Sequence, residues 1–119
     1  MKKILVVEDN ELNMKLFYDI LTYHKFQVDK AYDGIEAYSK IKNNIYNLII
    51  LDIQLPKLDG FSLVKKLQEE KIETSNIIIT SACAMDKDKN KAREYKIDTY
   101  ITKPIDIHSF INIVESKLQ

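Results

Sequence analysis

Short runs of apolar residues alternate along the chain with longer segments in which apolar residues recur every three or four positions. The short runs predict buried strands, and the helical spacing between them predicts crossover helices that join parallel strands. The predicted strands are Lys3 to Val7, Phe26 to Ala31, Leu48 to Leu51, Ile77 to Thr80 and Thr99 to Ile101. This alternation indicates an α/β fold in which helices cover both faces of one parallel sheet.

The predicted strands differ in polarity. Those that begin at Lys3, Leu48 and Ile77 consist almost entirely of Ile, Leu and Val, as expected for strands buried on both faces. The strands that begin at Phe26 and Thr99 are more polar, and we therefore expect them at the edges of the sheet.

Helical spacing predicts a helix after each strand. In the first and second helices the residues expected to face the sheet are Leu12, Leu16, Phe17, Ile20 and Leu21, and Ile35, Tyr38 and Ile41. In the third and fifth helices they are Val64 and Leu67, and Phe110, Ile113, Val114 and Leu118. Asp106 is a candidate N-cap of the fifth helix. The fourth helix, Asp86 to Tyr95, has only Ala92 and Tyr95 to bury. We expect this helix to be weakly held and mobile.

Length and composition narrow the protein class. The 119 residues fit one domain, 1–119, and 18 basic side chains balance 18 acidic ones, so no global field favours nucleic acid or a membrane surface. The single Cys83 excludes an intrachain disulfide, and no apolar run suits a signal peptide or a membrane span. We expect a cytoplasmic protein. Because the sequence ends at Gln119, soon after the last predicted helix, its output is expected to be protein contact.

Polar residues follow four of the predicted strands. Glu8 and Asp9 follow the first, Asp52 the third, Ser81 the fourth and Lys103 the fifth. Open doubly wound sheets bind ligands beyond the carboxyl ends of their strands. If the first and third strands are neighbours, three carboxylates meet there and repel one another, so a cation is expected. Hard oxygen ligands favour Mg2+.

Each of these residues has an ordinary explanation when it is taken alone. Acids such as Glu8 and Asp9 are common before helices, Asp52 could be a loop acid, Ser81 could cap a turn and Lys103 could be a solvated surface lysine. Their joint position at the ends of alternating strands favours a site. In such a site Asp52 could accept a phosphoryl group, which Ser81 and Lys103 would contact.

Four segments carry a family resemblance: Ile4 to Asp9, Leu51 to Pro56 with Asp59-Gly60, Thr80 to Ala82, and Tyr100 to Pro104. Together they resemble the receiver domain of two-component response regulators over essentially the whole chain. The resemblance implies a flavodoxin-like, doubly wound sheet of five parallel strands in the order 2-1-3-4-5 with five helices. The segment Glu8 to Phe17, with Asp52 to Pro56, further resembles the single-domain regulators of cell division in this family.

The resemblance also implies the metal site and the acceptor. Asp52 would be the phosphoacceptor and Mg2+ the cofactor. Asp9 would bind the metal directly, Glu8 through water, and Gln54 through its backbone carbonyl. Glu8 stands where Asp is more usual in the family.

The switch is implied in the same way. Ser81 and Lys103 would bind the phosphoryl group, Tyr100 would turn inward when Ser81 is drawn to it, and the Lys103–Pro104 peptide bond would be cis. Ser81 stands where Thr is more frequent, and serine lacks the methyl group that restricts rotamers. We therefore expect a slightly looser switch.

The expected partners are a phosphoryl donor and a downstream regulatory protein. The donor, a histidine kinase or histidine phosphotransfer protein, is expected on the first helix, where Asn13 and Met14 would lie near the crevice mouth and Phe17 in the core. The downstream protein is expected on the face from Ala84 through Tyr100 to the last helix.

Three further residues are expected to lie outside this chemistry. His24 and His108 are expected away from the crevice, and Cys83 is expected to border it without a redox role.

Three other classes remain as alternatives. An aspartate-nucleophile phosphohydrolase would need a second acid where Gln54 stands. A flavin-binding module would need a Ser/Thr/Gly-rich loop where Glu8 and Asp9 stand. A phosphorylation-independent interaction module would leave the complete site without a purpose.

Overall fold

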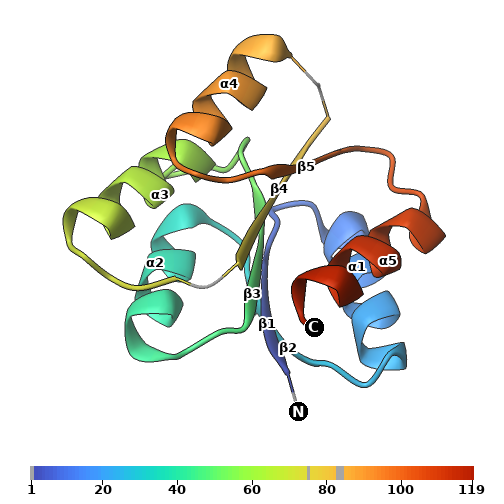
Figure 1. Ribbon diagram of the computed structural model, residues 1–119. Helices are drawn as coiled ribbons and strands as arrows, with labels where there is room; N and C mark the ends of the chain where they lie inside the picture. The colour runs from blue at the N-terminus through green and yellow to red at the C-terminus, as the bar shows by residue number, and fades with distance from the viewer. Residues whose placement is uncertain (1, 75, 83–84) are drawn as a thin grey trace.

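The computed structural model describes residues 2–74, 76–82 and 85–119 and contains one parallel sheet in the order β2-β1-β3-β4-β5. The elements are β1 Lys3–Val7, α1 Glu11–Tyr23, β2 Gln27–Ala31, α2 Gly34–Asn43, β3 Leu48–Asp52, α3 Gly60–Glu69, β4 Asn76–Ser81, α4 Asp86–Glu94, β5 Thr99–Thr102 and α5 Ile107–Lys117. Helices α1 and α5 cover one face of the sheet, and α2, α3 and α4 lie on the other side (Figure 1). The predicted fold class, strand order and edge strands are confirmed.

The side chains of each strand alternate between two separate cores, because successive residues of a strand point to opposite faces. In β1, Ile4 and Val6 pack toward α1 and α5, whereas Leu5 and Val7 pack toward α2, α3 and α4. We call these two sets the α1/α5 core and the α2/α3/α4 core. The alternation fixes the side of the sheet on which each residue at a strand end projects.

The inward faces of α1 and α2 differ from the sequence prediction. Leu12, Leu16 and Ile35 were expected to pack on the sheet, but their exposed fractions are 80%, 36% and 56%. In α1 the buried residues are Met14, Phe17, Ile20 and Leu21, and in α2 they are Gly34, Ala37 and Ile41. The expectation was wrong because small residues occupy the inward positions of α2, and Leu12 lies off the stripe that runs from Met14 to Leu21.

Helix α4 buries little of its own surface, as its sequence predicts. Only Ala92 is buried, and Met85 at the N-cap makes no side-chain capping hydrogen bond. Two contacts hold its end against α3: the Phe61 and Tyr95 rings stack at 6.2 Å between centroids, and Gln68 Nε2 donates to Tyr95 O at 3.1 Å. The expected mobility of α4 stays a prediction, and Cys83 and Ala84 lie outside the described residues.

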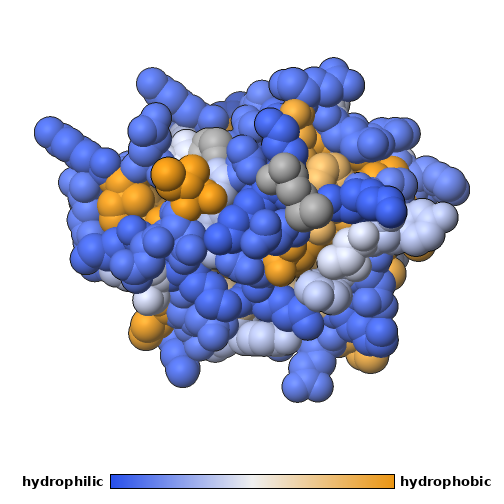
Figure 2. All heavy atoms as spheres, turned by 90° about the horizontal axis from the view of Figure 1, so that it is seen from below, coloured by the Kyte–Doolittle hydropathy of each residue, from blue (hydrophilic) through white to orange (hydrophobic). Residues whose placement is uncertain are grey.

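The surface at the end where the termini lie is mostly hydrophilic, and its hydrophobic residues form separate patches (Figure 2). Over residues 2–74, 76–82 and 85–119, the structure contains no helix that is both long and apolar enough to cross a membrane.

Three helices end on a lysine in the left-handed region: Lys25, Lys71 and Lys96, with φ of 72°, 56° and 63°. After α3, Ile72 N donates to Leu67 O at 2.9 Å and Lys71 N donates to Gln68 O at 3.1 Å. This pair of bonds is the Schellman motif, in which glycine is the usual residue because a Cβ disfavours positive φ.

Replacing Lys71 by glycine should therefore stabilise the protein by about 0.5–1 kcal/mol, because relief of the left-handed strain exceeds the added entropy of the unfolded chain. Urea unfolding monitored by circular dichroism measures the change. Lys71→Ala is the matched control, since it removes the same side chain and keeps the Cβ. A gain of the same size in Lys71→Ala would contradict the explanation.

Candidate functional site

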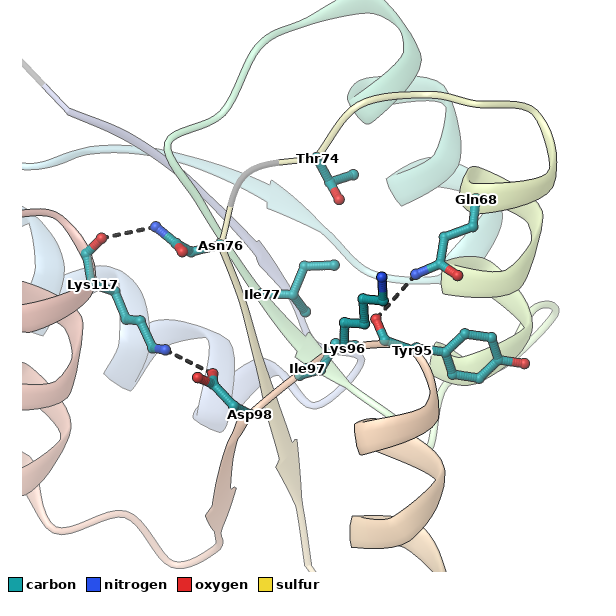
Figure 3. Close-up of a pocket in the computed structure, with 9 residues that line it drawn as sticks. All are labelled: Gln68, Thr74, Asn76, Ile77, Tyr95, Lys96, Ile97, Asp98 and Lys117. Carbon is teal, nitrogen blue, oxygen red and sulfur yellow. Dashed lines mark hydrogen bonds and ion pairs between the residues drawn. The ribbon is translucent and has the colours of Figure 1, made fainter.

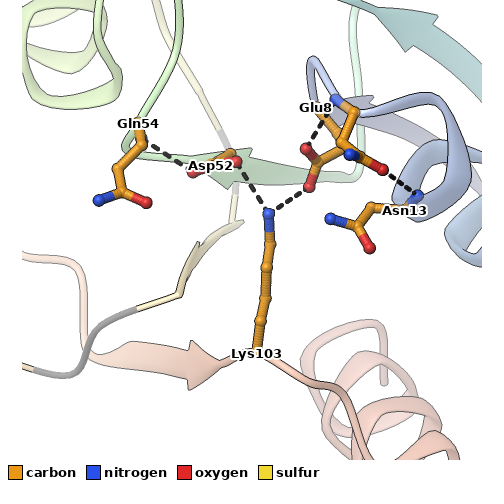
Figure 4. A network of polar contacts seen from close by, with 6 residues as sticks. Glu8, Asn13, Asp52, Gln54 and Lys103 are labelled. Carbon is orange, nitrogen blue, oxygen red and sulfur yellow. Dashed lines mark hydrogen bonds and ion pairs between the residues drawn. The ribbon is translucent and has the colours of Figure 1, made fainter.

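One lysine joins two buried carboxylates at the carboxyl edge of the sheet. Lys103, which follows β5, places its Nζ 2.5 Å from Glu8 Oε1 and 2.9 Å from Asp52 Oδ2 (Figure 4). Glu8 follows β1 and Asp52 ends β3, so residues far apart in the sequence meet here. The structure thus brings together three of the residues that the sequence singled out.

Backbone groups orient the other oxygen of each carboxylate. Asn10 N donates to Glu8 Oε2 at 3.0 Å, and Gln54 N donates to Asp52 Oδ1 at 2.8 Å. Both donors lie two residues after the acid, so the loop that follows each strand folds back over the strand end. For Glu8 the hydrogen bond from Asn10 acts to lower the pKa, because it favours the ionised carboxylate.

The loop after β3 lies close to the start of α3. A Cβ on Gly60 would lie 2.6 Å from Ile53 Cα and 2.9 Å from Asp52 O, both backbone atoms. Only glycine allows this approach without displacing the chain that carries Asp52.

Burial and ion pairing have opposite effects on the pKa values of Glu8 and Lys103. Glu8 and Asp52 are only 1% and 3% exposed. Burial raises the pKa of the Glu8 carboxyl, although the hydrogen bonds from Lys103 and Asn10 act against the rise. For Lys103, burial alone would lower the pKa, but hydrogen bonds to Glu8 and Asp52 hold it above its ordinary value. The ammonium therefore stays charged and offsets the repulsion between two buried acids.

Three acids lie close enough together to hold a metal ion. Glu8, Asp9 and Asp52 each offer a carboxylate oxygen, and these oxygens lie within 4.8 Å of one another. Opposite ligands of an octahedral shell at about 2.1 Å are roughly 4.2 Å apart, slightly less than this spread. The set therefore fits a hard cation that one acid holds through water, and Asp9 is the exposed member of the set.

Ser81 and Tyr100 belong to the neighbouring strands β4 and β5, on one side of β3 in the sheet. Ser81 is fully buried at the end of β4, and its carbonyl accepts a 2.7 Å hydrogen bond from Lys103 N. Tyr100 is partly buried against the α2/α3/α4 core. The predicted cis peptide between Lys103 and Pro104 is confirmed.

The first helix places only part of the predicted donor surface at the site. Asn13 is partly exposed beside the Glu8–Lys103 pair (Figure 4), and its backbone N donates to Asn10 Oδ1 at 2.9 Å. Met14 was expected at the surface but is only 1% exposed in the α1/α5 core, because its place on the helix faces the sheet. Phe17 lies in the same core, as expected.

Other hollows lie away from the acidic cluster. One lies at the amino ends of β4 and β5, where Lys117 Nζ pairs with Asp98 Oδ1 at 2.8 Å and Asn76 Nδ2 donates to Lys117 O at 2.8 Å (Figure 3). His24 and His108 line another, between α1 and α5. Neither of these hollows includes a residue of the acidic cluster.

Thr80 is a further buried polar residue near the strand ends. The Thr80 side chain is buried, with an exposed fraction of 1%. Within the described residues, its Oγ1 is buried and has no hydrogen-bond partner. A β-branched residue inside an apolar run is expected in any strand, so no signal in the sequence distinguishes it.

Comparisons with known proteins agree with this geometry. The sequence model of one protein family, the response regulator receiver domain, matches residues 4–115 of this chain. The polar-differentiation response regulator DivK of Brucella ovis is 36% identical over 118 residues, covering 98% of this chain and 96% of that protein. This similarity confirms the predicted family resemblance.

Solved structures show the same fold. The receiver domain of Francisella response regulator 1452 is 31% identical with a TM-score of 0.91, covering 99% of this chain and 97% of that one. The receiver domain of a sensor histidine kinase from Pseudomonas aeruginosa, with a magnesium ion coordinated in its active site cleft, is 26% identical with a TM-score of 0.85, covering 98% and 97% of the two chains. The match over residues 4–115, together with the sheet order and the acidic edge, means that this chain belongs to the response regulator receiver family.

Proposed function

We propose that residues 1–119 form one receiver domain that accepts a phosphoryl group on Asp52 from a histidine kinase or histidine phosphotransfer protein. The observation that carries the proposal is the Lys103 ammonium, which contacts both Asp52 and Glu8 while Asp9 lies within reach. A cation held against a buried carboxylate at a strand end is suited to binding an incoming anionic group.

The transfer itself forms one bond and breaks another. A carboxylate oxygen of Asp52 attacks the phosphorus of a phosphohistidine, a P–O bond forms, and the P–N bond breaks with its electron pair returning to the imidazole nitrogen. Positioning and charge stabilisation are the main demands of such a step. Gln54 N, at 2.8 Å from Asp52 Oδ1, orients the carboxylate for the attack.

The metal set of this proposal consists of Asp9, Asp52, the backbone carbonyl of Gln54 and, through water, Glu8. The oxygen donors and their 4.8 Å spread support it. Mg2+ bound there would screen the negative charge of acceptor and donor as they approach. Lys103 and the Ser81 hydroxyl would bind the phosphoryl oxygens.

Phosphorylation would then shift the population toward the conformer in which Ser81 and Lys103 contact the phosphoryl group. Tyr100 would follow Ser81 inward and change the surface formed by α4, β5 and α5. A downstream regulatory protein would bind that surface more tightly. The similarity to DivK supports a role in cell-cycle or cell-division control.

Treatment with acetyl phosphate and Mg2+ should add the mass of one phosphoryl group to the intact protein. The gain should disappear in Asp52→Asn and in the presence of a chelator, because the first variant lacks the acceptor oxygen and the second condition lacks the metal. Intact-protein mass spectrometry measures both. Asp106→Asn is the matched control, because it makes the same change as Asp52→Asn at an exposed position. This variant should gain the same mass as the wild type. A full gain in Asp52→Asn would remove the proposal.

A further inference from the structure

The side chain of Lys103 crosses a neighbouring strand to reach its partners. Lys103 follows β5, whereas Asp52 ends β3, and β4 lies between these strands in the sheet. Its ammonium nevertheless lies 2.9 Å from Asp52 Oδ2 and 2.5 Å from Glu8 Oε1. The aliphatic stem of Lys103 must therefore pass over the end of β4.

The register of the sheet makes Thr80 the residue of β4 that lies between Asp52 and β5. Thr80 pairs with Asp52 on one side and with Ile101 on the other in the register of the sheet. It comes two residues after Ile78 of the α1/α5 core, as Asp52 comes two after Ile50 and Lys103 two after Ile101. Residues two apart project from the same face, so Thr80 faces the side on which Lys103, Asp52 and Glu8 meet.

A hydroxyl in this position would ordinarily find a partner. Thr80 Oγ1 is buried and, over the described residues, makes no hydrogen bond. Leaving a buried hydroxyl unsatisfied destabilises a protein, and valine has the same shape without this penalty. An ammonium has three donors, and the two contacts to Glu8 and Asp52 use two of those on Lys103.

We propose that the Thr80 hydroxyl is a positioning group for Lys103 in the phosphorylated state. When the phosphoryl group arrives on Asp52, the ammonium leaves Glu8 for the phosphoryl oxygens, and one of its N–H groups donates to Thr80 Oγ1 beneath it. The hydroxyl that is unsatisfied before phosphorylation becomes satisfied after it, so it favours the phosphorylated conformer. This inference rests on the proposed function of Asp52 and Lys103.

The test compares Thr80→Val, which removes the hydroxyl at constant shape, with Thr80→Ser, which keeps the hydroxyl. Calorimetric titration with beryllium fluoride in the presence of Mg2+ measures affinity for a phosphoryl analogue, and urea unfolding measures the stability of the free protein. We expect Thr80→Val to bind the analogue about tenfold more weakly, equivalent to about 1.4 kcal/mol. We expect it to unfold at equal or higher urea concentration, and Thr80→Ser to bind like the wild type.

The outcomes separate this inference from the proposed function. Equal analogue affinity in Thr80→Val and the wild type overturns the inference alone, because the wild type still binds. Lower stability in Thr80→Val, with affinity reduced to the same extent in Thr80→Ser, shows a structural role and also overturns it. No binding by the wild type, together with no mass gain from acetyl phosphate, overturns both.

Discussion

Replacing Lys103 by methionine should lower the free energy of unfolding at neutral pH by about 3 kcal/mol. The substitution keeps the apolar stem and removes the charge that contacts two carboxylates, which are only 1% and 3% exposed. Removing one partner of a buried ion pair leaves an uncompensated charge, and the loss is usually about 3–5 kcal/mol. The lower figure applies because the Lys103 side chain remains 15% exposed. Urea unfolding in the presence of a chelator measures the loss.

Lys65→Met is the matched control for this loss. Lys65 lies on the exposed face of α3 and takes part in no ion pair recorded in the described part of the chain, so its replacement should change stability by less than about 0.5 kcal/mol. Mg2+ should then stabilise Lys103→Met more than the wild type, because the metal supplies the missing positive charge without competing with an ammonium. Equal stability of the two methionine variants would show that Lys103 does not hold the acids together.

Replacing Gly34 by alanine should destabilise the protein by about 3 kcal/mol, although the same change in a helix usually stabilises by about 1 kcal/mol. A Cβ on Gly34 would lie 1.9 Å from Leu58 O and 2.7 Å from Leu58 Cβ. The nearest atom belongs to the backbone, so no side-chain rotation relieves the clash. The start of α2 and the loop after β3 would have to separate.

Thermal unfolding measures the stability of Gly34→Ala, and Ser39→Ala serves as the control variant. Ser39 is exposed on the same helix, and its replacement should be nearly neutral or slightly stabilising. Because the displaced loop begins at Asp52, Gly34→Ala should also take up less phosphoryl group from acetyl phosphate. An increase in stability would show that the two segments separate without loss.

The sequence predicts the architecture well because strand burial leaves a direct pattern. The apolar run in β3 predicts a central strand, and all five of its residues are buried. The positions of Glu8, Asp52 and Lys103 at strand ends then predict that they meet, since the carboxyl ends of parallel strands share one edge. That prediction needed no knowledge of side-chain conformations.

Other features depend on tertiary geometry that no local pattern contains. Ile35 is apolar but exposed, whereas Gly34 is buried at the start of α2 because the loop at Leu58 leaves no room for a Cβ there. Likewise, the ion pairs of Lys103 with both Glu8 and Asp52 depend on the conformation of a long side chain, which the strand pattern does not contain. The unsatisfied hydroxyl of Thr80 is invisible for the same reason.

The alternation along β4 has one more consequence. Thr80 and Ser81 are adjacent in sequence, but Thr80 faces the side of the acids and Ser81 faces the side of Tyr100. The switch proposed above, in which Tyr100 follows Ser81 after phosphorylation of Asp52, therefore depends on which face of β4 each residue occupies. One residue inserted into β4 before Thr80 would move Thr80 and Ser81 to the opposite faces of the sheet, because a one-residue slip turns every side chain over. The proposed switch would then be lost. Two inserted residues would return each side chain to its original face, so the spacing of residues along β4 matters to the switch as much as their identity.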